Sequence, residues 1–184
     1  MGVLRRFVLL IDSVGTALGE MPLLARCVSS TLMVSHGLRR DSELYMLVRG
    51  RGALVLRAEA LRRVHPDEHS LQGVLSKGLN ALDRGRRGPV HSGVYVRDLG
   101  LGAVVEKGSD LIYVHDRGRP LPARGFRSVR VVAVAPLRGY GPEDLSELRD
   151  LGGEPVRVSV KNVSPDVAFV LVNYEMDRWL RGAR

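Results

Sequence analysis

The hydrophobic pattern near the N-terminus predicts a strand followed by a helix. Residues Val3–Ile11 form the first apolar stretch, interrupted only by Arg5 and Arg6, and it is typical of a strand. From Pro22 to His36 apolar residues recur at helical spacing instead, and Gly37 stands where a left-handed residue commonly ends a helix. Leu24, Val28, Leu32 and Met33 would share the buried face of this helix.

A hairpin and a second helix are predicted next. Two β-like runs, 43–48 and 53–57, are separated by Arg49–Gly52, whose glycines permit a tight turn. His65–Ser70 then opens a helix with leucines at helical intervals, which ends near Asp83. The Gly- and Arg-rich segment 84–89 is expected to be an exposed basic loop.

Short elements fill the middle of the chain, and the C-terminal third is strongly patterned. We expect a strand at 93–96, a turn or short helix around 99–106, a strand at 111–114, a turn at 116–120, strands at 129–135 and 156–160, a helix at 142–151, and a final helix from Ser164-Pro165-Asp166 to about Leu180. This alternation predicts an α/β sheet with helices on both faces and parallel crossovers, in a single domain spanning residues 1–184.

Composition excludes several classes of protein. With 184 residues and 45% hydrophobic content the chain can bury a core, yet no apolar run reaches the roughly 18–20 residues of a membrane span. The run Phe7–Ile11 is too short for a signal peptide, so we expect a cytoplasmic protein with no membrane partner. Cys27 lies in an apolar helical pattern and is expected in the core rather than as a nucleophile. His65, Glu68 and His69 lack the spacing of a zinc-protease motif, so no metal is predicted.

The charge of the chain favours a nucleic-acid partner. Its net charge is +8, and 25 of its 28 basic residues are arginine. Arginine binds phosphates through two hydrogen bonds and stacks on bases, although codon bias or heat adaptation would give the same composition.

Two glycine pairs suggest where a ligand would bind. Gly100-Leu101-Gly102 and Gly139-Tyr140-Gly141 resemble the start of a dinucleotide motif, but neither has the third glycine. The loop at Gly139 follows a predicted buried strand, as does the loop 161–164. Ligands in α/β sheets bind beyond the carboxyl ends of strands, so these loops are expected to wall one cleft.

Several short segments carry a resemblance to a known family. They are Arg26-Cys27-Val28 with Ser35-His36, Arg39-Arg40-Asp41, Pro66-Asp67-Glu68 with Lys77, Gly93–Arg97, and Asn173–Asp177. In order and spacing the chain resembles a divergent member of the archaeal tRNA (pseudouridine-54 N1)-methyltransferases of the SPOUT superfamily.

The resemblance implies a SPOUT-type sheet with a C-terminal trefoil knot at about 110–184, S-adenosylmethionine as cofactor, tRNA as substrate and a homodimer. The final helix, with Val167, Val170, Leu171, Met176 and Trp179, would meet the partner chain. Carried over by position, the cofactor would contact Val114, Ala135, Gly139, Val158, Ser159, Val160, Lys161, Asn162, Val163 and Ala168.

The chain departs from the family pattern where chemistry would occur. Gly-Asp-His is replaced by Ala135-Pro136-Leu137, Gly-Arg-x-Asp by Gly19-Glu20-Met21-Pro22, and a polar stretch by Pro165–Ala168. Asp166 and Arg138 remain as positional catalytic candidates, although they read equally as a helix-start aspartate and a solvated arginine.

The function therefore has three interpretations. The first is an S-adenosylmethionine-dependent methyltransferase of pseudouridine in the tRNA T-loop, or of another RNA site. The second is a catalytically inactive RNA-binding dimer with the same fold, and the third is an unrelated nucleotide-binding α/β protein. For RNA contact the candidates are Arg5, Arg6, Arg26, Arg39, Arg40, Arg84, Arg86 and Arg87.

Overall fold

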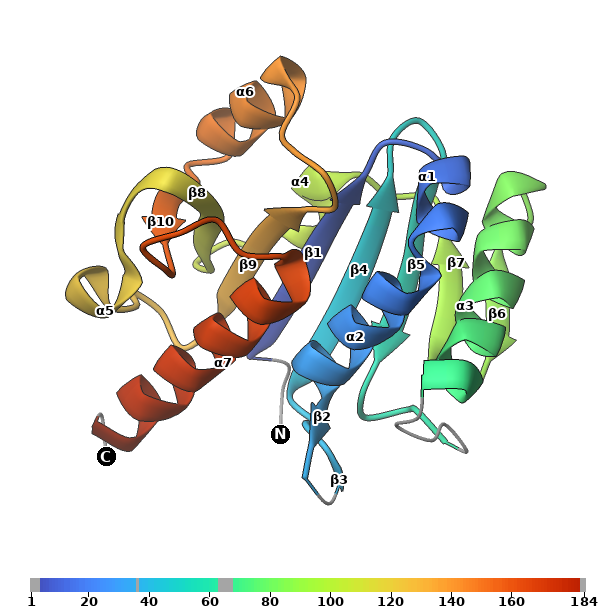
Figure 1. Cartoon of the computed structure of the whole chain (residues 1–184), viewed down its shortest axis with the longest axis horizontal. Helices are drawn as coiled ribbons and strands as arrows, with labels where there is room; N and C mark the ends of the chain where they lie inside the picture. The colour runs from blue at the N-terminus through green and yellow to red at the C-terminus, as the bar shows by residue number, and fades with distance from the viewer. Residues whose placement is uncertain (1–3, 36, 63–67, 183–184) are drawn as a thin grey trace.

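A computed structural model describes residues 4–35, 37–62 and 68–182, and its centre is one mixed sheet (Figure 1). Five neighbouring strands are parallel, and the last three toward the other edge are antiparallel. The order across the sheet is β10 (Glu154–Arg157), β8 (Asp110–Pro120), β9 (Val131–Pro136), β1 (Arg5–Ile11), β4 (Ser42–Val48), β5 (Gly52–Arg57), β7 (Val94–Arg97) and β6 (Gly88–His91).

Helices cover both faces of this sheet, as predicted. Two separate hydrophobic clusters lie on the two faces of the sheet. One contains Phe7 and Leu9, and the other contains Val8. The helices α1 (Val14–Gly19), α2 (Met21–Leu32), α3 (Glu68–Asp83) and α7 (Pro165–Gly182) pack on the first face, and α4 (Leu101–Val104) and α6 (Pro142–Asp150) on the second (Figure 1). The α/β class is confirmed.

The segment before β4 differs from the expectation of one helix over 22–36. A short α1 precedes α2, because the Ser13 hydroxyl accepts the Thr16 N–H at 3.1 Å and caps it. Helix α2 ends at Leu32, and Met33 turns to extended geometry to start a small hairpin of β2 (Met33–Val34) and β3 (Gly37–Leu38). Cys27 is fully buried in α2, as expected, and burial raises the pKa of its thiol.

The predicted turn at 116–120 is wrong. Strand β8 continues to Pro120, where Arg119 and Pro120 pair with Val156 and Arg157 of β10. Between Tyr113 and Arg119 the pairing skips five residues of β8, and Gly118 packs so tightly that an added Cβ would lie 2.5 Å from the Val156 backbone. Strand β10 consequently runs over 154–157 rather than 156–160. The short helix α5 (Leu121–Arg124) was not foreseen.

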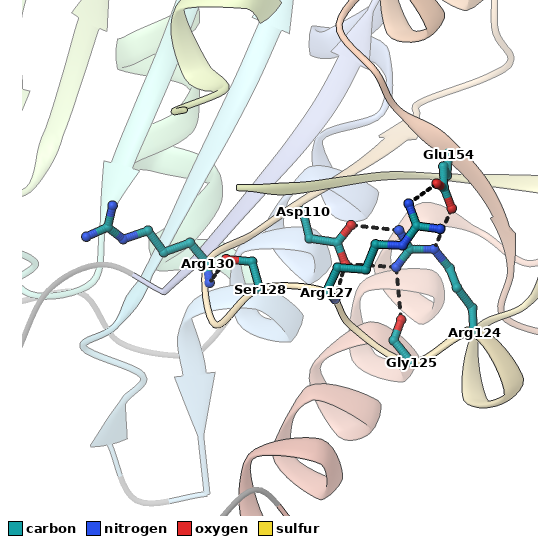
Figure 2. Close-up of polar contacts among 7 residues, drawn as sticks. All are labelled: Asp110, Arg124, Gly125, Arg127, Ser128, Arg130 and Glu154. Carbon is teal, nitrogen blue, oxygen red and sulfur yellow. Dashed lines mark hydrogen bonds and ion pairs between the residues drawn. The ribbon is translucent and has the colours of Figure 1, made fainter. Parts of the chain in front are cut away.

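An ion cluster holds β8, α5 and β10 together (Figure 2). Arg124 donates to both carboxylate oxygens of Asp110, at 2.8 and 2.6 Å, and to Glu154 at 3.0 Å. Burial opposes ionisation of Asp110, but hydrogen bonds from Arg124 and from the Arg127 N–H outweigh it and lower the pKa of this carboxyl. The cluster therefore stabilises the edge of the sheet formed by β8 and β10. The chain continues from β10 into α7.

A second cluster joins the first strand to the last helix. Arg5, only 3% exposed, donates to Asn173 at 2.9 Å and to Asp177 at 2.6 Å. Arg39 donates to the same Asp177 carboxylate, at 2.9 and 3.1 Å. Asn173 in turn donates to the Ser30 carbonyl of α2, at 2.9 Å. Helix α7 is thus held in one orientation against β1 and α2.

Two sequence-based exclusions concern membranes and metals. Within the described ranges no helix has the length and apolarity needed to cross a membrane. The same residues contain no group of three or more His, Cys, Asp or Glu that could hold a metal ion. The motif residues His36, His65, Pro66 and Asp67 lie outside the described residues.

Candidate cofactor cavity

A cavity of about 440 Å³ opens at the carboxyl end of β9 and beside the middle of β8, directly after the residues of β8 that pair with β9. Val114–Asp116 of β8, Ala135–Tyr140 at the end of β9, and the loop from Arg157 to Pro165 line it. Leu23 of α2 and Ala168 of α7 complete the wall. Carboxyl ends of parallel strands meet at one edge, which explains why segments distant in sequence share this space.

The wall combines an apolar side with a polar rim. Ala135, Leu137 and Ala168 are buried, and the small alanine side chains keep the space beside them open. Ser159, Lys161 and Asn162 follow β10 on the other side. Such a mixture suits a ligand with an aromatic ring at one end and charged groups at the other.

His115 and Tyr140 form an aromatic pair in this wall. Their rings are stacked at 22° with centroids 6.2 Å apart, and the Tyr140 hydroxyl donates to the Val134 carbonyl at 3.0 Å. Burial raises the pKa of Tyr140, which keeps it neutral. His115 Nδ1 lies 2.9 Å from Asp116 Oδ1 and accepts the Arg117 N–H at 3.2 Å. His115 and Asp116 thus place a ring nitrogen and a carboxylate side by side on the cavity wall.

A family comparison decides the class of protein. A sequence model described as "Putative SAM-dependent RNA methyltransferase" matches residues 8–180. The chain belongs to this family. The resemblance seen in the sequence is thereby confirmed.

Relatives of this methyltransferase with similar sequences are archaeal. The chain is 31% identical over 173 residues to a tRNA (pseudouridine(54)-N(1))-methyltransferase of Methanococcus maripaludis, covering 87% of this chain and 86% of that protein. It is 28% identical over 170 residues to the protein of the same description from Methanocella arvoryzae, with coverage of 87% and 86%.

Solved structures show the same fold. Archaeoglobus fulgidus Nep1 bound to S-adenosylhomocysteine aligns with a TM-score of 0.66 at 16% identity, over 98% of this chain and 100% of that one. The ribosomal RNA small subunit methyltransferase E of Neisseria gonorrhoeae, bound to S-adenosyl methionine, aligns with a TM-score of 0.51 at 15% identity, over 96% and 66%. The methyltransferase fold therefore extends over nearly the whole chain.

The cavity of this methyltransferase gathers nine of the ten residues that the sequence assigned to the cofactor. Val160 is the exception, because it is 93% exposed and lies outside the lining. The nine are Val114, Ala135, Gly139, Val158, Ser159, Lys161, Asn162, Val163 and Ala168.

The two catalytic candidates lie in different surroundings. Arg138 lines the cavity, and its Nη2 lies 3.3 Å from Glu20 Oε1. Asp166 instead accepts a hydrogen bond from Arg26 Nε at 3.1 Å and does not line the cavity. Sequence reasoning missed His115 and Asp116, although two polar residues directly after an apolar strand were the available signal.

The predicted RNA-contacting arginines do not converge on one face. Arg5 is a correction, because it is buried and its guanidinium binds Asp177 and Asn173. Arg6 pairs with Glu43 and Glu106, and Arg39 with Asp177. Arg26 pairs with Asp166, and Arg40 is exposed at the amino end of β4. Arg84, Arg86 and Arg87 line a different cavity, beside α3 and β6.

Proposed function

We propose that this protein transfers the methyl group of S-adenosylmethionine to N1 of pseudouridine 54 in tRNA. The observation that carries the proposal is the cavity at the carboxyl end of β9 and the middle of β8, in a chain of this RNA methyltransferase family. The relatives that act on this tRNA position match over 86–87% of their own length.

The cavity fits the cofactor in size and chemistry. Its volume of about 440 Å³ falls within the roughly 300–1,000 Å³ common for small-molecule sites. We assign the adenine to the apolar side formed by Val114, Leu137 and Ala168, and the amino-acid end to Lys161 and Asn162. When bound, the cofactor supplies an electrophilic methyl group.

The chain must then remove the N1 proton of pseudouridine as the new N–C bond forms. His115 is our candidate acceptor, because it lines the cavity and its Nδ1 lies 2.9 Å from Asp116 Oδ1, whose negative charge would stabilise the imidazolium that results. Arg138, on the same wall, would stabilise negative charge on the ring during proton loss. These two side chains stand in for the polar groups absent at Pro136 and Leu137.

The proposal includes a single domain over residues 1–184, a trefoil knot at about 110–184, a homodimer and a cytoplasmic location. The knot is supported by the strand order β10-β8-β9, because the chain crosses outside β8 before α7 returns to α2. The dimer is supported by α7, on which Val167 and Val170 are 42% and 49% exposed. Met176 is fully buried in the core of its own chain, and Trp179 is partly buried against that core.

Mass spectrometry of digested tRNA tests the reaction. Protein and cofactor are incubated with tRNA carrying pseudouridine at position 54 and with the same tRNA carrying uridine there. We expect N1-methylpseudouridine in the first sample alone. A methylated nucleoside at another position would indicate a different RNA site, and cofactor binding without transfer would favour the non-catalytic RNA-binding dimer.

A further inference from the structure

A second cavity of about 470 Å³ lies near the opposite edge of the sheet from the cofactor cavity, beside β6 and β7. The C-terminal half of α3, the loop after it, β6 and Val96 of β7 line this space. Four of its lining side chains are cations, namely Lys77, Arg84, Arg86 and Arg87. Among the described residues only Arg87 of these four has a carboxylate within ion-pair distance, and that partner, Asp98, is 3.9 Å away and 83% exposed. The cavity is therefore strongly positive.

The backbone that presents these cations is fixed. Gly85 adopts a positive φ of 69°, its N–H donates to the Leu82 carbonyl at 3.0 Å, and the Arg86 N–H donates to the Ala81 carbonyl at 2.9 Å. These bonds close the end of α3 with a glycine cap. One cation near this cap would offset the helix dipole, whereas four around a hollow repel one another. Their gathering favours a bound anion.

The position of this cavity relates it to the methyl-transfer site. Arg87 Nη2 donates to the carbonyl of Arg51 at 3.1 Å, and Arg51 lies in the turn that follows the carboxyl end of β4. The basic loop thus lies at the same end of the sheet as the cofactor cavity (Figure 1). Four strand spacings separate β9 from β7, a distance of roughly 19 Å. The exposed Arg51 lies in the turn between β4 and β5, two strands that stand between β9 and β7 in the sheet.

We infer that this cavity binds backbone phosphates of the same RNA whose target base enters the cofactor cavity. The inference rests on the proposed function in one respect, that the substrate is RNA. Several arginine guanidinium groups and a lysine around one cavity suit phosphate, because two phosphate oxygens can accept two hydrogen bonds from one guanidinium. RNA bound along this end of the sheet would be held at two places, and the second contact would orient the arm that carries the base.

Binding of tRNA at several salt concentrations tests the inference. The triple variant Arg84→Ser/Arg86→Ser/Arg87→Ser is compared with the wild type by fluorescence anisotropy without cofactor. Each phosphate contact contributes about 0.7–0.9 to the slope of log K against log salt, so the slope should flatten by about 2. Binding should weaken at least tenfold at low salt. An unchanged slope would overturn the inference.

A matched control removes the same charge from the opposite end of the parallel strands. Arg62→Ser/Lys107→Ser/Arg130→Ser changes three exposed cations, which lie after β5, before β8 and before β9. We expect its slope to change by less than 1. Equal flattening in both triple variants would show a general effect of net charge and would also overturn the inference.

Two further measurements keep the result independent of folding and of catalysis. Calorimetric cofactor binding should be the same in the triple variant and the wild type, which shows that the variant is folded. Should the triple variant not fold, the single variants Arg86→Glu and Arg86→Ser provide the same test. We expect Arg86→Glu to bind tRNA more weakly than Arg86→Ser. The salt dependence of tRNA binding is measured without methyl transfer. It can therefore be interpreted even if the proposed reaction does not occur.

Discussion

Arg124 and Asp110 form a bidentate pair beside the edge strand β10 of the sheet. Both side chains are almost fully buried, at 2% and 3% exposure, and their two hydrogen bonds measure 2.8 and 2.6 Å. The pair joins the first residue of β8 to α5, directly beside Glu154 of β10 (Figure 2). Removing one partner would leave the other charge buried with reduced compensation.

We therefore expect Arg124→Met to lower the free energy of unfolding by about 3–5 kcal/mol. Urea denaturation measures the change. Arg127→Met is the matched control, because Arg127 is 62% exposed and pairs with the same Glu154 at the surface. It should cost no more than about 1 kcal/mol. Equal losses in the two variants would contradict a special role for the buried pair.

Stability should fall in acid. Burial opposes ionisation of Asp110, Glu154 and Asp177, but hydrogen bonds from arginines outweigh it, so the pKa of each carboxyl lies below its ordinary value. The unfolded chain then binds more protons than the folded one. The stabilisation is complete above the unfolded pKa of about 4 and is lost as pH falls through the lower folded values.

Urea titrations between about pH 5 and pH 2 should show this decline in the free energy of unfolding. The double variant Asp110→Asn/Arg124→Met should show a shallower one, since one of the three carboxyls is gone. A steeper decline in the double variant would be inconsistent with this assignment.

Gly118→Ala should disrupt the edge of the cofactor cavity. The new Cβ would lie 2.5 Å from the backbone N and C of Val156, and backbone atoms cannot move aside as a flexible side chain can. We expect lower thermal stability and at least tenfold weaker binding of S-adenosylmethionine by calorimetry. Gly73→Ala, where nothing lies within 4 Å, should be neutral or stabilise its helix by about 0.5–1 kcal/mol. Wild-type cofactor affinity in Gly118→Ala would argue against this packing.

His115→Ala should reduce methyl transfer more than cofactor binding. Loss of a positioned proton acceptor typically costs about 10²–10⁴ in rate, so kcat should fall by that order with little change in cofactor Kd. His69→Ala, at an exposed position of α3, should match the wild type. A kcat within twofold of wild type would remove His115 from the proposed proton transfer.

Val170→Glu should disrupt the proposed homodimer. Val170 is 49% exposed on α7, and a charge buried there at an interface would be unpaired. Sedimentation should change from a dimer to a monomer of about 20.2 kDa. Val129→Glu is the control, because Val129 is 51% exposed ahead of β9 and outside α7. A monomeric wild-type protein at micromolar concentration would refute the dimer.

Most elements were predictable, because their signals are local. Alternating apolar runs and helix-start residues located β1, the β4–β5 hairpin, α6 and α7. The errors fall where distant partners decide the conformation. Residues 116–120 have the composition of a turn, yet β10 draws Arg119 and Pro120 into the sheet from more than thirty residues away.

The position of the cofactor cavity was also within reach of the sequence. Loops after buried strands meet at one edge of a parallel sheet, and the family resemblance indicated which loops to choose. The pairing of charges was not predictable, because ion pairs such as Arg5–Asp177 join residues 172 positions apart. Their positions at the ends of predicted elements indicated that Arg5, Arg6 and Arg39 are available to RNA, although each binds a carboxylate of its own chain.

The sequence by itself thus determined the α/β class, the order of the main strands and helices, the membership in the methyltransferase family and most of the cavity residues. These depend on local periodicity and on motifs that persist in order along the chain. Only the tertiary structure decided which arginines remain free, that His115 stacks on Tyr140, and that the basic loop lies at the same end of the sheet as the cofactor cavity. Such relationships depend on strand order and register, and a strand's own residues do not specify its neighbours.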